Sequence, residues 1–238
     1  MIFQLENVSV LRSGKEILHG VSCAVRPATL TFLTGLNGSG KSTLLQAMTG
    51  MLPFSGSISF LGRPLSYWTG KAFAQEVAVI HQLQSHPFDF KVRDFILLGR
   101  FPRLGVWGQY HTRDKEIMEA SAEIAGVKDF LDRNLPSLSG GELQKVYVAQ
   151  ALAQDTPVLV MDEPSRFLDP LNRLRFYQLL QDLTAQGKTI VCVSHDAEIF
   201  EIPQARFLGL REGALVWDGV LEEIGVRAFR EEVYQLRS

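Results

Sequence analysis

The sequence has little of several features that would place a protein in a specialised class. It has only two cysteines in 238 residues, Cys23 and Cys192, which lie far apart without the spacing of metal ligands. This excludes a disulfide scaffold, so we interpret both as small buried hydrophobes in a reducing compartment. No run approaches the roughly 20 apolar residues of a membrane span, and the N-terminus lacks the charged and apolar regions of a signal peptide. We therefore expect a cytosolic chain whose membrane role would come through a partner.

No charge of one sign predominates. The chain has 24 Lys and Arg against 26 Asp and Glu, a net charge of −2 and a pI near 6.2. Proteins that live on nucleic-acid phosphates usually carry a basic excess, so we expect no nucleic acid among the partners. Internal repeats and low-complexity linkers are absent, and a hydrophobic content of 46% is enough to bury a full core.

The hydrophobic pattern predicts strands that alternate with helices. Apolar and polar residues alternate in the first third, three-and-four spacing dominates from about 84 to 152, and strands return afterwards. This order predicts a mostly parallel α/β core over 1–83 and 153–238, with an antiparallel N-terminal part and an inserted helical lobe over 84–152. Expected strands cover 2–11, 16–25, 29–35, 56–62, 76–82, 157–164, 188–195 and a hairpin over 205–219. Expected helices cover 40–51, 92–100, 113–127, 141–153 and 171–187.

The segment "GLNGSGKST", 35–43, matches the pattern of a phosphate-binding loop, G-x-x-x-x-G-K-[ST]. It follows an apolar strand and opens a helix, which is the context that supports the pattern. Glycines let backbone N–H groups surround phosphate oxygens, while Lys41 can reach the β and γ phosphates and Ser42 can bind Mg²⁺. The predicted nucleotide-binding residues here are Asn37, Gly38, Ser39, Gly40, Lys41, Ser42 and Thr43.

A second segment, "LSGGE" at 138–142, also places a serine and two glycines before an apolar helix, yet it has no lysine. A single nucleotide does not need two phosphate loops. The segment therefore calls for a different role.

Carboxylates and two other polar side chains follow expected strands. Asp162 suits the acidic strand-end residue that holds Mg²⁺, and Glu163 is then placed to polarise the attacking water. Gln82 and His195 also end strands, where ligands of open α/β sheets bind, although such residues taken singly are more often structural.

Together these segments resemble the ATP-binding subunit of an ABC (ATP-binding cassette) transporter, over residues 1 to about 225. The resemblance rests on the order and approximate spacing of the phosphate loop, Gln82, "LSGGE", "VLVMDEP" at 158–164, "SRFLD" at 165–169 and His195. It implies a phosphate-loop NTPase core, ATP and Mg²⁺ as cofactors, and a head-to-tail homodimer. In that dimer the signature residues Ser139, Gly140, Gly141 and Glu142 would complete the partner's ATP site, which explains the missing lysine.

The resemblance also implies roles for other residues. Gln82 would ligate Mg²⁺ or position water and sense the membrane subunits, His195 would contact the γ-phosphate, and Asp169 would bridge the dimer. Glu142 replaces the usual glutamine. Arg166 and Phe167 stand where small residues are usual, which leaves the dimer contacts there uncertain. Arg12 stands where an aromatic residue commonly stacks on adenine, and its guanidinium could stack instead.

The lobe sequence "FKVRDFILLGRFPRLG" is similar to the ATPases of importers for iron-siderophore complexes, haem and cobalamin. The partners implied are two membrane permease subunits and a periplasmic or surface substrate-binding protein, with the chain at the cytoplasmic face of the inner membrane. Its aromatic-rich stretch lies where the family docks the permease, although each apolar residue could equally be lobe core. Those residues are Phe88, Phe90, Val92, Phe95 and Leu98. An exporter ATPase, a soluble mechanical ATPase and a non-hydrolysing subunit are the alternatives.

Overall fold

The computed structural model describes residues 1–81, 89–105, 108–221 and 225–235. The chain divides into two compact units: unit 1 comprises Met1–Trp68 and Tyr177–Ser238, and unit 2 comprises Thr69–Phe176. The boundary near residue 176 falls inside helix α6, Pro170–Ala185. The division of the chain at 84 and 152 into core and lobe stays a prediction.

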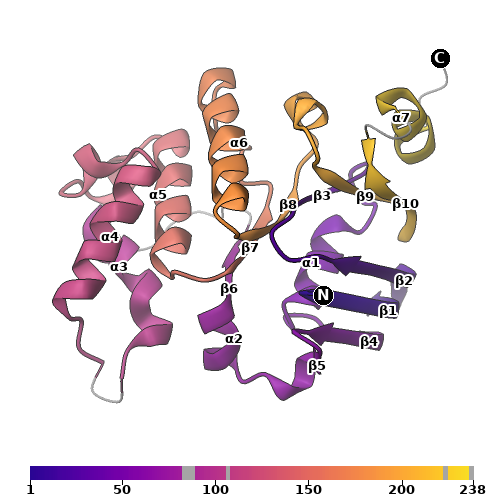
Figure 1. Ribbon diagram of the computed structural model, residues 1–238, viewed down its shortest axis with the longest axis horizontal. Helices are drawn as coiled ribbons and strands as arrows, with labels where there is room; N and C mark the ends of the chain where they lie inside the picture. The colour runs from indigo at the N-terminus through magenta and orange to yellow at the C-terminus, as the bar shows by residue number, and fades with distance from the viewer. Residues whose placement is uncertain (82–88, 106–107, 222–224, 236–238) are drawn as a thin grey trace. The chain divides into compact units, whose positions relative to one another are not determined.

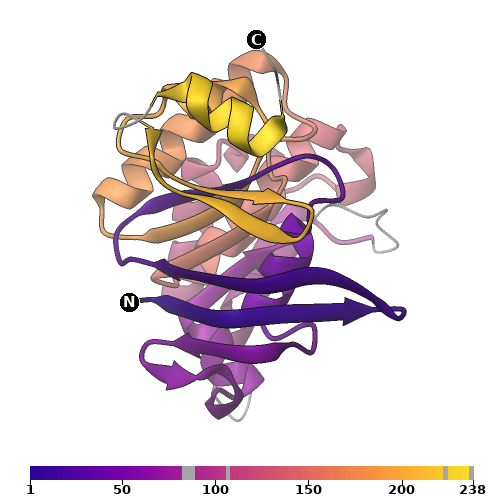
Figure 2. The same cartoon turned by 90° about the vertical axis from the view of Figure 1, so that its right-hand side faces the viewer.

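Unit 1 begins with an antiparallel sheet. Strands β1 (Phe3–Arg12) and β2 (Lys15–Val25) pair with each other, and β1 also pairs with β4 (Ser55–Phe60), which pairs with the short β5 (Arg63–Pro64). Figure 2 shows β1 and β2 as long neighbouring strands. In β1, buried and exposed residues largely alternate, which is typical of a sheet with one solvated face.

The rest of unit 1 is built on parallel strands. Strand β3 (Leu30–Thr34) lies parallel to β8 (Thr189–Val193) on one side and to β9 (Arg206–Arg211) on the other, while β10 (Ala214–Val220) runs antiparallel to β9. Every residue of β3 and β8 is buried, as expected of strands covered on both faces. The unit also contains α1 (Lys41–Met48), η1 (Leu65–Tyr67), η5 (Ala197–Glu201) and α7 (Val226–Tyr234).

Unit 2 combines a parallel strand pair with a group of helices. Strands β6 (Val77–Ile80) and β7 (Val158–Asp162) pair in parallel. Helices α3, α4 and α5 pack against one another, as Figure 1 shows. The helical segments of this unit are α2 (Gly70–Glu76), α3 (Val92–Leu97), η2 (Leu98–Arg103), α4 (Thr112–Ile124), η3 (Lys128–Phe130), η4 (Leu135–Ser137) and α5 (Gly140–Ala153).

The predicted fold class is confirmed: parallel strands with helices, an antiparallel N-terminal sheet and a group of helices around the second glycine segment. Both cysteines are buried, as predicted. The sequence prediction missed α2, α7 and the short 3₁₀ segments. Among the described residues, no helix combines the length and apolar character that crossing a bilayer requires.

Candidate functional site

The phosphate loop lies at the end of β3 in unit 1, and its tip is exposed while its root is buried. Gly35 has a φ of 144°, and a Cβ there would lie 2.1 Å from the carbonyl oxygen of Leu210, so only glycine fits. Lys41 is 6% exposed, and its ammonium group donates to the carbonyls of Gly35 at 2.9 Å and Leu36 at 3.0 Å. The loop thus holds its own cation at its centre.

The N-terminus of α1 has no side-chain cap. Gly40 occupies the N-cap with a φ of 103°, its residue type offers no side chain to cap the helix, and the first turn carries no acidic residue. The N–H groups of that turn and the positive end of the helix dipole therefore face the loop, beside Lys41. Such an arrangement can bind an anion, as helix N-termini that hold nucleotide phosphates do. All seven predicted residues, from Asn37 to Thr43, lie in this loop and the first turn of α1, and their contact with a nucleotide stays a prediction.

Two further predicted residues belong to unit 1. His195 is exposed and lies in the segment between β8 and η5, two residues after the last residue of the fully buried strand β8. Arg12 is exposed at the end of β1, where it pairs with Lys15 across the hairpin. His195 therefore lies just beyond the end of β8 rather than at its last residue, and its role and that of Arg12 stay predictions.

The acidic pair lies in unit 2. Asp162 ends β7 and is 6% exposed, after four fully buried apolar residues. Glu163 follows with a φ of 49°, a left-handed conformation that costs a non-glycine residue of order 1–3 kcal/mol. Its carboxylate lies 3.9 Å from the guanidinium of Arg166. Neighbouring carboxylates thus have different settings, one buried in the strand end and one on a strained turn, as expected if their roles differ.

The signature segment is the start of α5. Ser139 is the N-cap: its hydroxyl accepts from the Glu142 N–H at 3.3 Å, and its own N–H donates to the Glu142 carboxylate at 2.7 Å. This is a capping box, which the S-x-x-E spacing could have revealed. Arg133 donates to Glu142 at 3.1 Å and to the Ser137 carbonyl at 2.6 Å. The N–H of Ser139, and then Arg133, hold the pKa of the Glu142 carboxyl below its usual value.

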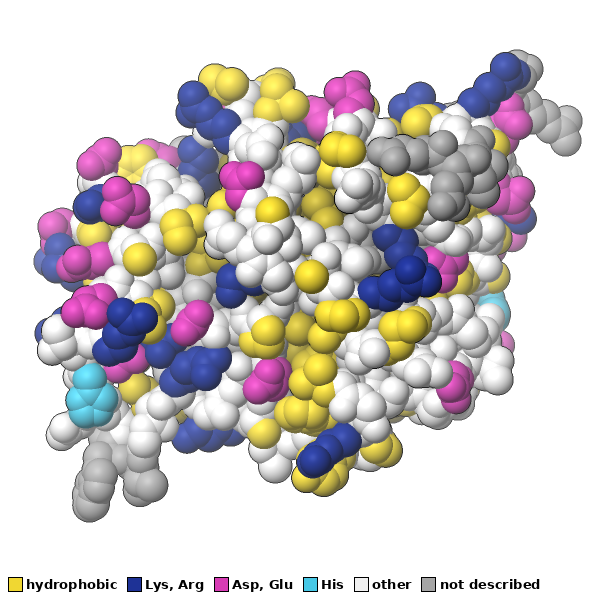
Figure 3. Space-filling model, in the orientation of Figure 1, with side chains coloured by type: hydrophobic (Ala, Val, Ile, Leu, Met, Phe, Trp, Pro, Cys, Tyr) yellow, Lys and Arg dark blue, Asp and Glu magenta, His cyan; other side chains and the backbone are white. Residues whose placement is uncertain are grey.

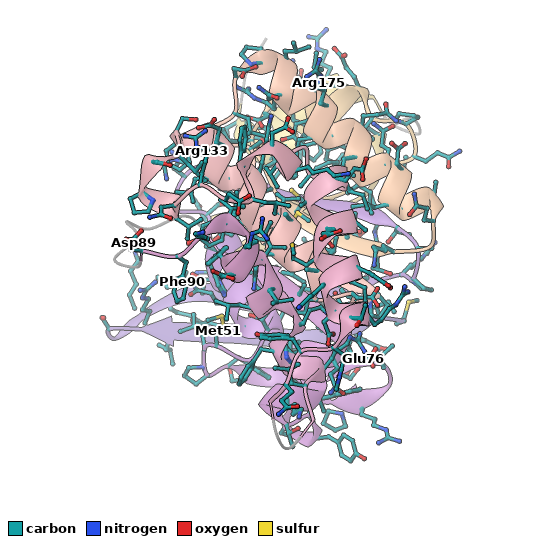
Figure 4. All side chains as sticks on the ribbon, turned by 90° about the vertical axis from the view of Figure 1, so that its left-hand side faces the viewer. Met51, Glu76, Asp89, Phe90, Arg133 and Arg175 are labelled. Carbon is teal, nitrogen blue, oxygen red and sulfur yellow. The ribbon has the colours of Figure 1, made fainter. Side chains whose placement is uncertain are left out.

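The segment that carries Phe90 is hydrogen-bonded to the chain just before the signature. The Leu135 N–H donates to the Phe90 carbonyl, and the N–H of Val92 donates to the Arg133 carbonyl, both at 2.9 Å. Figure 4 shows Phe90 and Arg133 along one edge of the ribbon. Phe90 is 37% exposed, whereas Val92 is fully buried, so the aromatic-rich stretch divides into surface and core residues.

Asp169 caps helix α6. Its carboxylate accepts from the backbone N–H of Asn172 at 2.9 Å and from the Asn172 amide, and these bonds hold the pKa of Asp169 below its usual value. Phe167, one of the unusual residues of "SRFLD", lies beside the signature: a Cβ at Gly140 would be 3.5 Å from its side chain. The dimer contact predicted for Asp169 stays a prediction, since its observed role is local.

The structure therefore groups the predicted residues in two sets. Unit 1 holds the phosphate loop, Arg12 and His195, and unit 2 holds Asp162, Glu163, the signature and Asp169. Gln82 and Phe88 lie outside the described residues. The sequence prediction missed Arg133, which supports the signature, and Tyr177, discussed below. Figure 3 shows acidic and basic side chains intermixed over the helices of unit 2.

Comparisons with known proteins agree with the family resemblance of the sequence. The family model described as ABC transporter matches residues 18–166. The chain is 34% identical over 229 residues to the hemin import ATP-binding protein of Pseudomonas aeruginosa, covering 94% of this chain and 88% of the relative. It is 29% identical over 233 residues to the iron(3+)-hydroxamate import ATP-binding protein of Bacillus subtilis, covering 97% and 87%. A nucleotide-free ATP-binding cassette from an ABC transporter has the same fold, with a TM-score of 0.83 at 22% identity over 98% of this chain and 95% of that one. The chain therefore belongs to the ABC transporter family, as an ATPase component.

Proposed function

We propose that the chain is the MgATP-hydrolysing subunit that powers import of a metal chelate, working as a head-to-tail homodimer under two membrane subunits. The observation that carries the proposal is that one chain contains two different glycine-rich helix N-termini able to face a phosphate. That of α1 has a lysine, and that of α5 has none. Relatives named for hemin and iron(3+)-hydroxamate import support the substrate class. Such subunits act at the cytoplasmic face of the membrane, beside a permease and a substrate-binding protein.

Ser42, Asp162 and Gln82 are the proposed Mg²⁺ ligands. Hydroxyl, carboxylate and amide oxygens are the hard donors that this ion prefers. Asp162 is 6% exposed at the end of an apolar strand, and burial of a charge is unfavourable unless cations or donors compensate it. When bound, Mg²⁺ would neutralise charge on the β and γ phosphates.

Glu163 is the proposed general base and His195 the proposed γ-phosphate contact. The variant Glu163→Gln should keep ATP binding but lose at least about 100-fold in turnover, as is typical when a general base is removed. The exposed Glu116→Gln in the same unit is the matched control and should hydrolyse ATP normally. Near-normal turnover in Glu163→Gln would remove this residue from the catalytic role.

The composite site is tested by mixing two inactive variants. Ser139→Arg should block the signature while sparing the phosphate loop, and Lys41→Ala should do the converse. Each homodimer then has two broken sites. A mixed dimer has one intact site, because the loop of the first variant meets the signature of the second in a self-complementary interface. Differently tagged chains should therefore occlude about one ATP per mixed dimer.

A Ser139→Arg homodimer that occludes ATP and turns over normally would contradict the composite site. Loss of ATP occlusion in that variant, with no recovery of occluded ATP in confirmed mixed dimers, would contradict the head-to-tail arrangement; recovery of hydrolysis is not required, because the two sites can need to fire together.

Unit 2 offers the proposed docking surface for the permease. Phe90 and Arg93 are exposed there, and Arg93 pairs with Asp132 at 2.7 Å. The unit also holds an apolar pocket of about 470 Å³ between α2 and η2, with Phe101 at 68% exposure among its lining residues. Aromatic and arginine side chains dominate the energetics of protein interfaces.

Phe90→Ala should lower chelate transport in proteoliposomes with the permease, without changing the ATPase rate or melting temperature of the isolated subunit. Phe88, the other aromatic residue proposed for this surface, can be tested in the same way. Val92→Ala is the core control and should lower the melting temperature instead. If Phe90→Ala lowers the melting temperature as much, Phe90 is core and the docking surface lies elsewhere.

A further inference from the structure

Tyr177, on the buried side of α6, forms a closed ring of hydrogen bonds with the residues on either side of His195. Its hydroxyl donates to the Asp196 carboxylate at 2.6 Å and lies 2.8 Å from the Ser194 hydroxyl. The Asp196 N–H donates to the Ser194 hydroxyl oxygen at 3.1 Å. Since the single Tyr177 proton goes to Asp196, the Ser194 hydroxyl must donate to Tyr177. Each hydroxyl in the ring therefore donates once and accepts once.

Burial makes this ring an effective constraint. Tyr177 is 2% exposed and Ser194 1%, so breaking a bond leaves a buried polar group without compensation from water. The Tyr177 ring packs edge-on against Phe32 of β3, with centroids 5.9 Å apart. Strand β3 leads into the phosphate loop, and β8 leads into the turn of His195. One side chain thus contacts the strand before the loop and closes the turn that carries the histidine.

His195 itself is exposed between two residues that the ring holds. We propose that Tyr177 is a positioning residue for ATP hydrolysis, which fixes the backbone of the Ser194–Asp196 turn so that His195 is presented to the γ-phosphate. This inference rests on the proposed role of His195. Because Tyr177 is 2% exposed, its expected effect is on the geometry of the reacting group rather than on ATP binding.

The test is Tyr177→Phe in the full chain, which keeps the ring contact with Phe32 and removes only the hydroxyl. Turnover should fall about 10-fold, with the KM for ATP within about twofold of wild type, because misplacing a reacting group lowers kcat without weakening the ground-state complex. In a His195→Ala background the same substitution should have no further effect, since the group to be positioned is gone.

Leu180→Val, at a fully buried position one turn further along α6, is the matched stability control. It should lower the melting temperature without changing kcat. Ser194→Ala breaks the ring from another side with little change in volume and should reproduce the kcat loss, even if Tyr177→Phe folds poorly.

Unchanged kcat in both ring variants would overturn the proposal, as would an equal kcat loss in Leu180→Val at a matched loss of melting temperature. The proposed function has its own outcome. If His195→Ala hydrolyses ATP normally, the role of His195 fails; if His195→Ala is inactive while both ring variants are normal, only the inference about Tyr177 fails.

Discussion

The two glycine-rich helix starts of this chain are built on opposite principles. The start of α1 has glycine at its N-cap, no side-chain cap, no acidic residue in its first turn and a buried lysine. The start of α5 has a serine cap, an acidic residue in its first turn and an arginine that pairs with it. The first start has no side-chain cap on its N–H groups, whereas the second uses the N–H groups of Ser139 and Glu142 in its own capping box.

The difference indicates what each start can contribute to an ATP site. At α1, the helix dipole and Lys41 can bind a phosphate without help. At α5, the capping box uses the N–H groups of Ser139 and Glu142, so those of Gly140 and Gly141 are the ones a phosphate could meet. The Ser139 oxygen accepts within the box, and its proton can still be donated. The cap fixes the geometry of this helix start before any ligand binds, but the start offers few donors and no lysine to a phosphate. This suits a segment that completes a phosphate site whose main contacts come from another segment.

Replacing a glycine by alanine at each helix start should have its largest effect at α1. Gly40→Ala puts a Cβ at a φ of 103° and 2.7 Å from the Leu18 side chain, so it should destabilise unit 1 by about 1–3 kcal/mol or more and abolish ATP binding. Titration with a fluorescent ATP analogue measures the loss. Gly14→Ala, a left-handed glycine with open space around it, is the control and should bind ATP normally.

At α5 the same change should separate stability from activity. Gly140 has an ordinary φ, and an added Cβ would be in normal contact with Phe167 at 3.5 Å. Gly140→Ala should therefore raise stability by about 0.5–1 kcal/mol, because glycine is a poor helix residue, while turnover falls about 10-fold from obstruction of the phosphate. A variant that is stabilised and fully active would show that this turn faces no ligand.

Removing the positive charge of the Arg133–Glu142 pair at α5 should have a smaller effect on ATP hydrolysis. Arg133→Met leaves the Glu142 carboxylate uncompensated where a triphosphate should approach, so the KM for ATP should rise a few-fold at low salt. The pair is partly exposed, at 40% and 28%, so the melting temperature should change little. Restoration of KM in the double variant Arg133→Met with Glu142→Gln would identify charge as the cause. The Arg133 guanidinium also lies over the Phe130 ring, 5.2 Å from its centroid, and persistence of the defect would indicate loss of that contact instead.

The smallest effect concerns pH. Because the folded chain holds the pKa of Glu142 below its usual 4.5, the stabilisation is present above about pH 4.5 and is lost as pH falls through the folded value. We expect a few tenths of a kcal/mol, as for a carboxylate at a helix N-terminus. Urea unfolding at pH 6 and pH 3.5 measures it. Glu142→Gln should show a smaller loss between these pH values; an identical loss would exclude this carboxyl.

Much of the fold was predictable because the hydrophobic pattern of the sequence indicates its strands. The continuous apolar runs before Gly35, Asp162 and His195 predicted the buried strands β3, β7 and β8. Helices α2 and α7 were missed. Helix α2 has seven residues, none of them buried, and in α7 only Phe229 and Val233 are buried. A helix that buries so little leaves a weak pattern.

The sequence by itself determined the local chemistry: which segments can open a helix on a phosphate, and which strands end in a carboxylate or an imidazole. These are short-range properties, set by residues within a few positions of one another. Only the tertiary structure decided the left-handed backbone of Glu163, the pairing of Arg133 with Glu142 and the ring through Tyr177. Tyr177 is 17 residues from Ser194, and no periodic pattern links them. Their contact exists because α6 packs its buried side toward the end of β8, and packing over that distance is a property of the folded chain.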